Sequence, residues 1–141
     1  MIKRHRLPAD MADRLKLLKP LLEADTRVLF AYIFGGLAHD VIRPLSDVDI
    51  AVYLGGCGDF SEMKLELAGR LSDTLGTDEI DLVILNNACL SLVGRIIRRK
   101  RAIVDKEPFL RHAFESRVMR EFFDFSRKEE SILLRRFSNG G

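Results

Sequence analysis

The stretch that decides the fold spans residues 28–54 and reads VLFAYIFGGLAHDVIRPLSDVDIAVYL. It begins with a continuous apolar, β-rich run that ends at the glycine pair Gly35-Gly36. After ten further residues, Asp47 and Asp49 stand one residue apart at the start of a second β-branched run. Both runs are typical of buried strands. The stretch therefore predicts two strands, the second of which begins with a pair of carboxylates.

Segments of helix and strand character flank this stretch on both sides. Helices are predicted at 8–24, 59–75 and 88–99, and strands at 79–85 and 102–105. Asp59 and Glu62 predict a capping box at the start of the second helix, with Gly76 as its stop. From residue 107 the chain reads as helical almost to 137, with a break near Ser126. The order predicts an α/β (α+β) fold in which helices pack on a small mixed sheet.

Length and composition favour one globular domain over residues 1–141, with a core at about 28–106 and C-terminal helices at about 107–137. No apolar run is long enough to span a bilayer, and the basic N-terminus lacks the apolar segment of a secretory signal. We therefore expect a cytoplasmic protein without a membrane partner. Cys57 and Cys89 lack the spacing of a zinc site, and we expect them to be reduced.

Three carboxylates can converge on one face of the predicted sheet. Asp47 and Asp49 are two residues apart in a strand, so they project from the same side. Asp81 lies within the apolar run of the next strand, where an acidic residue is costly unless it is paired, protonated or bound to metal. Carboxylate oxygens suit Mg²⁺, which keeps phosphate oxygens in its shell. Taken singly, Asp47 also fits a turn and Asp81 an arginine pair.

The glycine pair adds a second half to this interpretation. Without a Cβ, Gly35 and Gly36 leave their backbone N–H groups open to a triphosphate, and a helix starting there adds its positive end. A hydroxyl nucleophile would then attack the α-phosphorus in line, and pyrophosphate would leave. A strand that ends in two glycines is also an ordinary turn, so the inference depends on the glycines and the carboxylates occurring together in this order.

The pattern from Gly35-Gly36 through Asp47-Val48-Asp49 to Asp81 resembles that of the nucleotidyltransferase superfamily of the DNA polymerase β type. It is most similar to the minimal nucleotidyltransferase domains, which carry Gly-Ser, ten residues and Asp-x-Asp. The run PLSDVDIAV at 44–52 and the aromatic run REFFDF at 120–125 also resemble that subfamily. The resemblance covers roughly residues 28–125.

Members of this subfamily are often antitoxins paired with HEPN-domain RNase toxins. The resemblance implies a nucleotidyltransferase fold and the transfer of AMP from ATP to a toxin tyrosine, with one or two Mg²⁺ ions. It implies metal ligation and catalysis by Asp47, Asp49 and Asp81, and nucleotide contacts by Gly35, Gly36 and Ser46. The expected partners are ATP and the toxin; nucleic acid is not expected as the direct substrate.

Two departures from the family pattern keep other functions open. Gly36 stands where the family has serine, and His39-Asp40 stands where it has Arg-Gly. An alternative is therefore a catalytically degenerate antitoxin that neutralises its toxin by binding alone. A third is transfer of a nucleotide to a small molecule such as an aminoglycoside, although such enzymes usually carry an added acceptor domain.

The C-terminal third is basic and aromatic. Residues 1–93 carry a net charge of −4, whereas residues 94–141 carry +6 and six of the nine phenylalanines. The basic cluster is Arg95, Arg98, Arg99, Lys100 and Arg101. It either compensates a helix dipole or contacts RNA or an acidic toxin surface. The phenylalanines indicate either a fully buried helix or an apolar surface for a partner, in a homo- or hetero-oligomer formed through the C-terminal helices.

Overall fold

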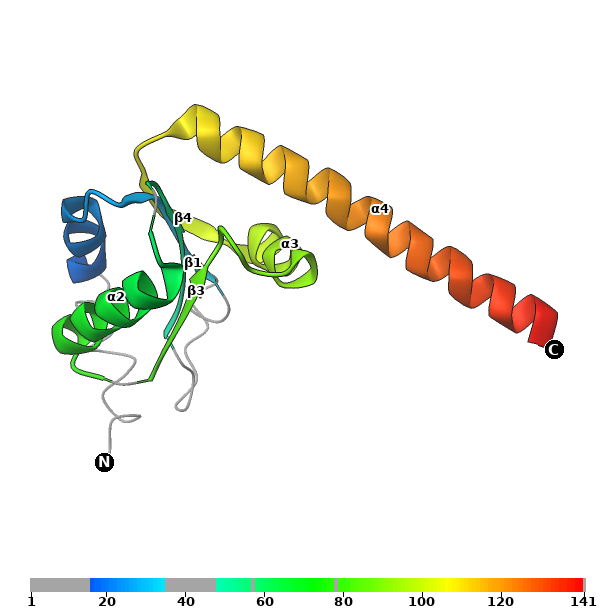
Figure 1. Cartoon of the computed structure of the whole chain (residues 1–141), viewed down its shortest axis with the longest axis horizontal. Helices are drawn as coiled ribbons and strands as arrows, with labels where there is room; N and C mark the ends of the chain where they lie inside the picture. The colour runs from blue at the N-terminus through cyan, green and yellow to red at the C-terminus, as the bar shows by residue number, and fades with distance from the viewer. Residues whose placement is uncertain (1–15, 35–47, 57, 78, 141) are drawn as a thin grey trace.

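The computed structural model describes residues 16–34, 48–56, 58–77 and 79–140, the last six by their backbone alone. A helix over 16–24 precedes the elements labelled in Figure 1. These are β1 (Val28–Phe34), β2 (Val48–Leu54), α2 (Phe60–Leu75), β3 (Ile80–Ile84), α3 (Leu90–Arg99), β4 (Arg101–Asp105) and α4 (Pro108–Gly140). The α+β architecture predicted from the sequence is confirmed.

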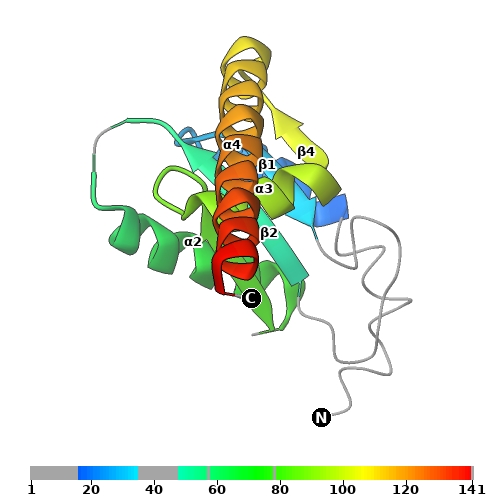
Figure 2. The same cartoon turned by 90° about the vertical axis from the view of Figure 1, so that its right-hand side faces the viewer.

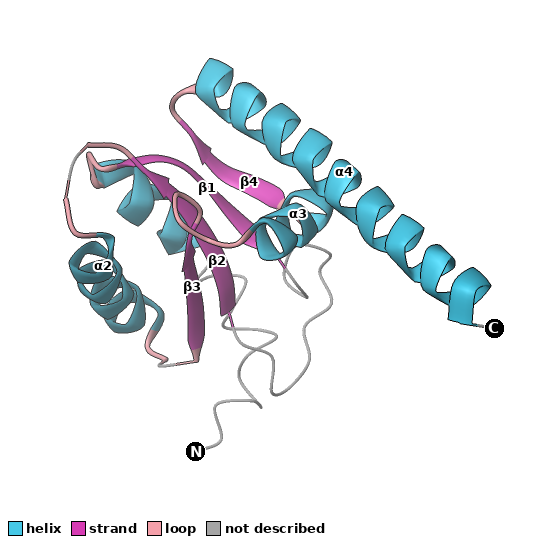
Figure 3. Cartoon of the chain, turned by 45° about the vertical axis from the view of Figure 1, so that its right-hand side comes forward, coloured by secondary structure: helices cyan, strands magenta, loops and turns pink. Residues whose placement is uncertain are grey.

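The four strands form one mixed sheet in the order β3-β2-β1-β4. β1 runs antiparallel to both of its neighbours, β2 and β4, whereas β2 and β3 are parallel. The long excursion through α2 is what allows β3 to return parallel to β2, because parallel strands need a crossover connection. β3 and β4 are consequently the outer strands of the sheet (Figure 3).

Helices cover both faces of the sheet. Leu18 and Leu22 of the first helix and three leucines of α2 pack against one face. On the other face, Val93 and Ile96 of α3 and Phe114 of α4 pack against aromatic residues of β1. Because successive strand residues point to opposite sides, β1, β2 and β3 each contribute to both cores. This two-sided burial explains why β1 and β2 read as continuous apolar runs.

The ends of α2 are set by local chemistry. Asp59 is the N-cap, and its carboxylate accepts a hydrogen bond of 2.9 Å from the Ser61 N–H. The bond therefore goes to the second helical residue, whereas the predicted capping box would use the third, Glu62. Gly76 ends the helix with φ of 68°, a left-handed conformation that glycine adopts without a Cβ clash.

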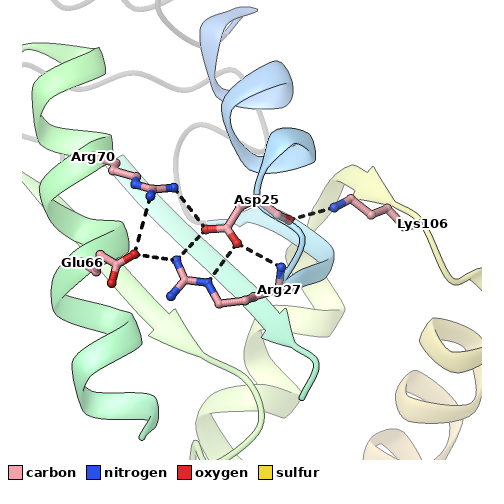
Figure 4. A network of polar contacts seen from close by, with 5 residues as sticks. All are labelled: Asp25, Arg27, Glu66, Arg70 and Lys106. Atoms are coloured by element: carbon pink, nitrogen blue, oxygen red, sulfur yellow. Dashed lines mark hydrogen bonds and ion pairs between the residues drawn. The ribbon is translucent and has the colours of Figure 1, made fainter. Parts of the chain in front are cut away.

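A buried carboxylate joins the first helix to the sheet and to α2 (Figure 4). Asp25 is only 7% exposed, and both of its oxygens accept hydrogen bonds from the Arg27 guanidinium, at 3.0 and 2.8 Å. Glu66 of α2 accepts from Arg27 at 3.1 Å, and Arg70 lies 3.6 Å from Asp25. The Lys106 ammonium donates to the Asp25 carbonyl at 2.9 Å. The attraction and hydrogen bonds of these partners offset the cost of removing the Asp25 carboxylate from water.

A second network attaches α4 to the sheet. The Tyr32 hydroxyl of β1 donates to Glu115 Oε2 of α4 at 2.5 Å, and Lys100 lies 3.1 Å from the same oxygen. Arg111, one turn earlier in α4, pairs with Glu115 at 3.2 Å and with Asp105 of β4 at 3.0 Å. Lys100, one member of the predicted basic cluster, therefore faces inward and holds α4.

α4 is one continuous helix of 33 residues, so the break expected near Ser126 is wrong. The segment from 109 to 138 contains no proline or glycine that would interrupt the hydrogen-bond ladder. Its first half packs on the body, and its second half projects away from it (Figures 1 and 2). Phe114 is buried, but Phe109, Phe123 and Phe125 are 93%, 50% and 43% exposed. The helix is therefore not fully buried.

Close packing fixes where α4 crosses α3. A Cβ added at Gly94 of α3 would collide with the ring of Phe122, so only glycine lets the two helices approach this closely. Arg98 lies over the same ring, 6.0 Å from its centroid.

Among the described residues, no helix combines the length and apolarity needed to cross a bilayer.

Candidate functional site

Asp49 and Asp81 are register partners in the parallel strands β2 and β3. Neighbouring strands lie about 4.8 Å apart, and register partners project from the same face of a sheet. Val48, Ile50 and Leu82 alongside them are buried in the core that faces α2. The two carboxylates consequently point to the opposite face, which α3 covers. The structure confirms that adjacent strands bring these two acids together.

Their surroundings differ in a way that matters for chemistry. Asp49 is half-buried, whereas Asp81 is exposed. In the described part of the chain, no lysine or arginine forms an ion pair with Asp81. The alternative that Asp81 is simply neutralised by an arginine is therefore not supported. Asp81 therefore keeps its negative charge beside Asp49, and a divalent cation bound there would be attracted to both carboxylates.

The remaining predicted site residues lie outside the described residues: Gly35, Gly36, Ser46 and Asp47. Both ends of the segment that contains them are nevertheless fixed at the acidic pair. β1 ends at Phe34, which is the register partner of Asp49, and the described chain resumes at Val48. Val48 is itself anchored, since its N–H donates to the Glu79 carbonyl at 2.9 Å.

The described residues alone do not complete a metal centre. No group of three or more acidic, histidine or cysteine side chains within them is arranged to hold a metal ion. Asp49 and Asp81 provide two oxygen-donor side chains of the type that Mg²⁺ prefers. The donor type therefore fits the predicted Mg²⁺, and the third predicted carboxylate, Asp47, lies outside the described residues.

A groove of about 390 Å³ follows the outer edge of β3 and includes Asp81. Its walls come from the beginning of α2 and from the segment that leads into α3. The residues that line it are Phe60, Ser61, Lys64, Asp81, Leu82, Val83, Ile84, Asn87, Ala88 and Leu92. Apart from Asp81, none of these was predicted from the sequence. Leu92 is 37% exposed although it is apolar, but this exposure is a property of the folded chain, so no pattern in the sequence indicated the groove.

The basic cluster divides into two parts in the structure. Arg95, Arg98 and Arg99 are exposed and together line a hollow on α3. Arg98 and Arg99 occupy the last turn of that helix, where cations are favoured by the helix dipole. Lys100 turns inward to Glu115, as described above. Arg101, at the start of β4, is exposed as well. The cluster therefore contacts α4 through Lys100 and Arg98, and all of its members except Lys100 are exposed.

Comparison with protein families identifies the fold. The model of the family described as polymerase beta, nucleotidyltransferase, matches residues 16–109, which include the whole sheet, α2 and α3. No curated protein matches the chain in sequence. Several solved structures match it in three dimensions.

Toxin–antitoxin structures are among these matches, and three of them are described below. A chain from a toxin–antitoxin structure with AMP-PNP has a TM-score of 0.70 and 21% identity, with 89% of this chain and 98% of that chain covered. A chain from the MntA–HepT complex has a TM-score of 0.65 and 21% identity, with 90% and 98% covered. The third complex is of tri-AMPylated Shewanella oneidensis HEPN toxin with MNT antitoxin, with a TM-score of 0.66, 20% identity, and 91% and 98% covered.

The likeness extends over nearly the full length of these chains, and at this identity it establishes the fold. The family model covers about two thirds of the chain, including both strands that carry the acidic pair. This protein belongs to the polymerase beta nucleotidyltransferase family.

Proposed function

We propose that this protein is a Mg²⁺-dependent nucleotidyltransferase that acts as an antitoxin by transferring AMP from ATP to a tyrosine of a cognate HEPN RNase toxin. The single observation that carries the proposal is the register pairing of Asp49 with Asp81 on the face of the sheet that carries no α2. Family membership supports nucleotidyl transfer. Neighbouring structures with AMP-PNP and with an AMPylated HEPN toxin support the choice of nucleotide and acceptor.

The carboxylates would bind the metal, and the backbone nearby would bind the nucleotide. Asp49 and Asp81, together with Asp47, would hold Mg²⁺, which supplies neutralising charge to the triphosphate. The backbone at Gly35 and Gly36, with Ser46, would contact the phosphates. Asp81 is the exposed member of the described pair, so it is the one accessible to an acceptor.

The proposed reaction is an in-line substitution at the α-phosphorus. The tyrosine oxygen forms a bond to that phosphorus while the bond to the bridging oxygen breaks, and pyrophosphate leaves with the electron pair. Asp81 accepts the hydroxyl proton as the new bond forms. Positioning of the two substrates and stabilisation of charge supply most of the rate enhancement in such reactions.

An antitoxin that neutralises by binding alone is the second candidate, and Gly36 is the observation that favours it. The family pattern has serine at this position, and the loss of one hydrogen bond to a charged group costs about 1.5–3 kcal/mol. If that bond is made in the transition state, the rate falls about tenfold or more. Asp40 would add negative charge near the expected phosphate site.

One experiment separates the two candidates. The purified protein is incubated with the toxin, Mg²⁺ and ATP labelled at the α-phosphate, and label on the toxin is measured beside toxin activity. The transferase proposal predicts labelled toxin for the natural sequence and none for Asp47→Asn with Asp49→Asn. Asp73→Asn, at an exposed carboxylate of α2, serves as the control and should label normally. If Asp47→Asn with Asp49→Asn transfers no label but still neutralises the toxin fully, the binding-only function would be established instead.

A further inference from the structure

The outer edge of β3 is open along its length in the described part of the chain. Leu85 N–H donates to the Val52 carbonyl, and the Glu79 carbonyl accepts from Val48. Because backbone groups alternate in direction along a strand, the odd-numbered residues of β3 face β2. The N–H and C=O groups of the even-numbered residues, Ile80, Leu82 and Ile84, therefore point away from the sheet.

The groove at this edge can hold an extended chain. α2 supplies one wall with Phe60 and Lys64, and α3 supplies the other with Leu92. Leu92 is 37% exposed, and Val83 beside it is half-buried, so apolar surface lies open on the α3 side. A peptide bound to a sheet edge gains main-chain hydrogen bonds from the strand and specificity from pockets for alternate side chains.

The groove is continuous with the acidic pair because Asp81 belongs to both. On a strand added to β3, the residue opposite Asp81 would project to the same face, with its Cβ about 5 Å from that of Asp81. Diagonal neighbours lie about 7–8 Å away, still within reach of an aromatic side chain. An extended segment in this groove would thus present a side-chain hydroxyl to the exposed carboxylate.

We propose that the acceptor protein docks as an extended strand added to the open edge of β3, with its modified tyrosine in register with Asp81 or one pair away. The proposal rests on the transferase function proposed above. Residues on the tyrosine's face of the added strand would contact Val83 and Leu92, so an apolar residue two positions from the tyrosine fits. The intervening residue would face Lys64, which suits an acidic side chain.

The direct test is amide hydrogen exchange, measured residue by residue by NMR on the full chain. Its probes are the cognate HEPN toxin and nine-residue peptides centred on each of its tyrosines. We expect exchange at the amides of Ile80, Leu82 and Ile84 to slow about tenfold or more on binding. Binding that leaves these amides unchanged, with protection on α4 instead, would overturn the proposal. The proposal would also be overturned if the same amides became protected without any probe as the concentration of the protein was raised. That result would indicate pairing of the β3 edges of two copies.

Side-chain variants test the groove independently of exchange. Leu92→Asp and Lys64→Glu should each weaken toxin binding about tenfold or more, with ATP binding unchanged. Leu65→Asp is the matched control, since Leu65 is 76% exposed on α2 and does not line the groove. Lys64→Glu decides the outcome if Leu92→Asp does not fold. Unaltered binding by a folded groove variant would contradict docking here.

Failure of this inference is distinguishable from failure of the transferase proposal. Toxin that is labelled without protection of β3 would leave the transferase standing and overturn strand addition. Toxin that protects β3 but is not labelled by the natural sequence would leave the docking mode standing and overturn the transferase. No binding of the toxin or any peptide would overturn both.

Discussion

Two acidic centres of this protein use the same side chain for opposite purposes. Asp25 is buried and accepts hydrogen bonds from Arg27 on both oxygens, with Arg70 nearby. Asp49 and Asp81 instead stand beside each other on parallel strands, and Asp81 has no ion-pair partner in the part of the chain that the structure describes. A carboxylate neutralised by arginines stabilises the fold. A carboxylate without such a partner, as at Asp81, leaves negative charge available for a ligand.

The largest expected effect is on the side-by-side pair. Asp49→Asn with Asp81→Asn should reduce AMP transfer by roughly a thousandfold or more, because the proposed metal ligands and the proton acceptor are removed together. Asp81→Asn alone should leave the free energy of unfolding within about 0.5 kcal/mol of the natural value, since that exposed carboxylate forms no ion pair with the described residues. Labelling assays and urea denaturation on the same preparations check both parts. A variant that is inactive because it unfolds would break the comparison.

Packing without charge gives the next effect. Gly94→Ala places a methyl group against the Phe122 ring and should destabilise the protein by about 2 kcal/mol, the usual cost of overpacking. Gly94→Ala combined with Phe122→Ala should recover part of that loss, because the ring that obstructs the methyl is gone. Denaturation curves for the single and double variants measure this coupling. Additive losses would show that the two helices do not meet as described.

Asp25 provides the structural counterpart. Asp25→Asn should lower stability by about 2 kcal/mol at neutral pH through the loss of charge-assisted hydrogen bonds, with AMP transfer by the remaining folded protein unchanged. The hydrogen bonds from Arg27 outweigh burial and hold the pKa of Asp25 below its usual 3.8. A lowered pKa contributes stability above about pH 4, and this is lost as pH falls through the folded-state value.

The pH dependence therefore distinguishes the variant from the natural sequence. Stability measured from pH 7 down to pH 2 should fall less steeply for Asp25→Asn than for the natural sequence in the acid range. If the free energy of unfolding falls equally steeply with acid in both proteins, Asp25 is not the group that titrates. If folded Asp25→Asn protein lost AMP transfer at saturating substrate, Asp25 would not be a purely structural carboxylate.

Glu115 should give a smaller change of the same kind. Burial raises its pKa, but the hydrogen bonds from Tyr32 and Lys100 more than offset this, so the pKa of Glu115 lies below the usual value. Glu115→Gln keeps an acceptor for Tyr32 and loses the charge, so we expect about 1 kcal/mol of destabilisation. The contribution of a lowered pKa is lost as the pH falls through the folded-state value, so thermal unfolding should show a smaller difference at pH 3 than at neutral pH. An equal difference at both values would contradict the assignment.

The projecting half of α4 should show the smallest effect. Ile132→Ser with Leu133→Ser changes side chains that are 50% and 52% exposed, so stability should change by less than about 0.5 kcal/mol each. Urea denaturation checks this figure. A loss of several kcal/mol would mean that this half of the helix is covered in solution, by a second copy or by the body of the protein.

Much of the fold followed from periodicity. The apolar runs at 28–34 and 48–54 predicted β1 and β2, and the alternation at 79–85 predicted β3. The two-residue spacing placed Asp81 on the face of Val83. Sheet order did not follow, because pairing depends on contacts far apart in sequence. Without that order, the open edge of β3 and its groove could not be foreseen.

Local details failed where alternatives differ by little energy. An Asp N-cap can accept from the second or third helical amide, and Asp59 uses the second. Ser126 is a tolerable helix residue, so it did not end α4. The pairing of Lys100 with Glu115 joins segments from two helices that pattern reading treats separately.

The most direct test of the acidic pair is titration with Mn²⁺ as a paramagnetic substitute for Mg²⁺, in the presence of ATP, followed by NMR. The account predicts that amide signals around Asp49 and Asp81 broaden first, that those around Asp25 stay sharp, and that Asp49→Asn with Asp81→Asn abolishes the effect. Broadening centred elsewhere, or no broadening when ATP is bound, would contradict the claim that this pair is the metal site.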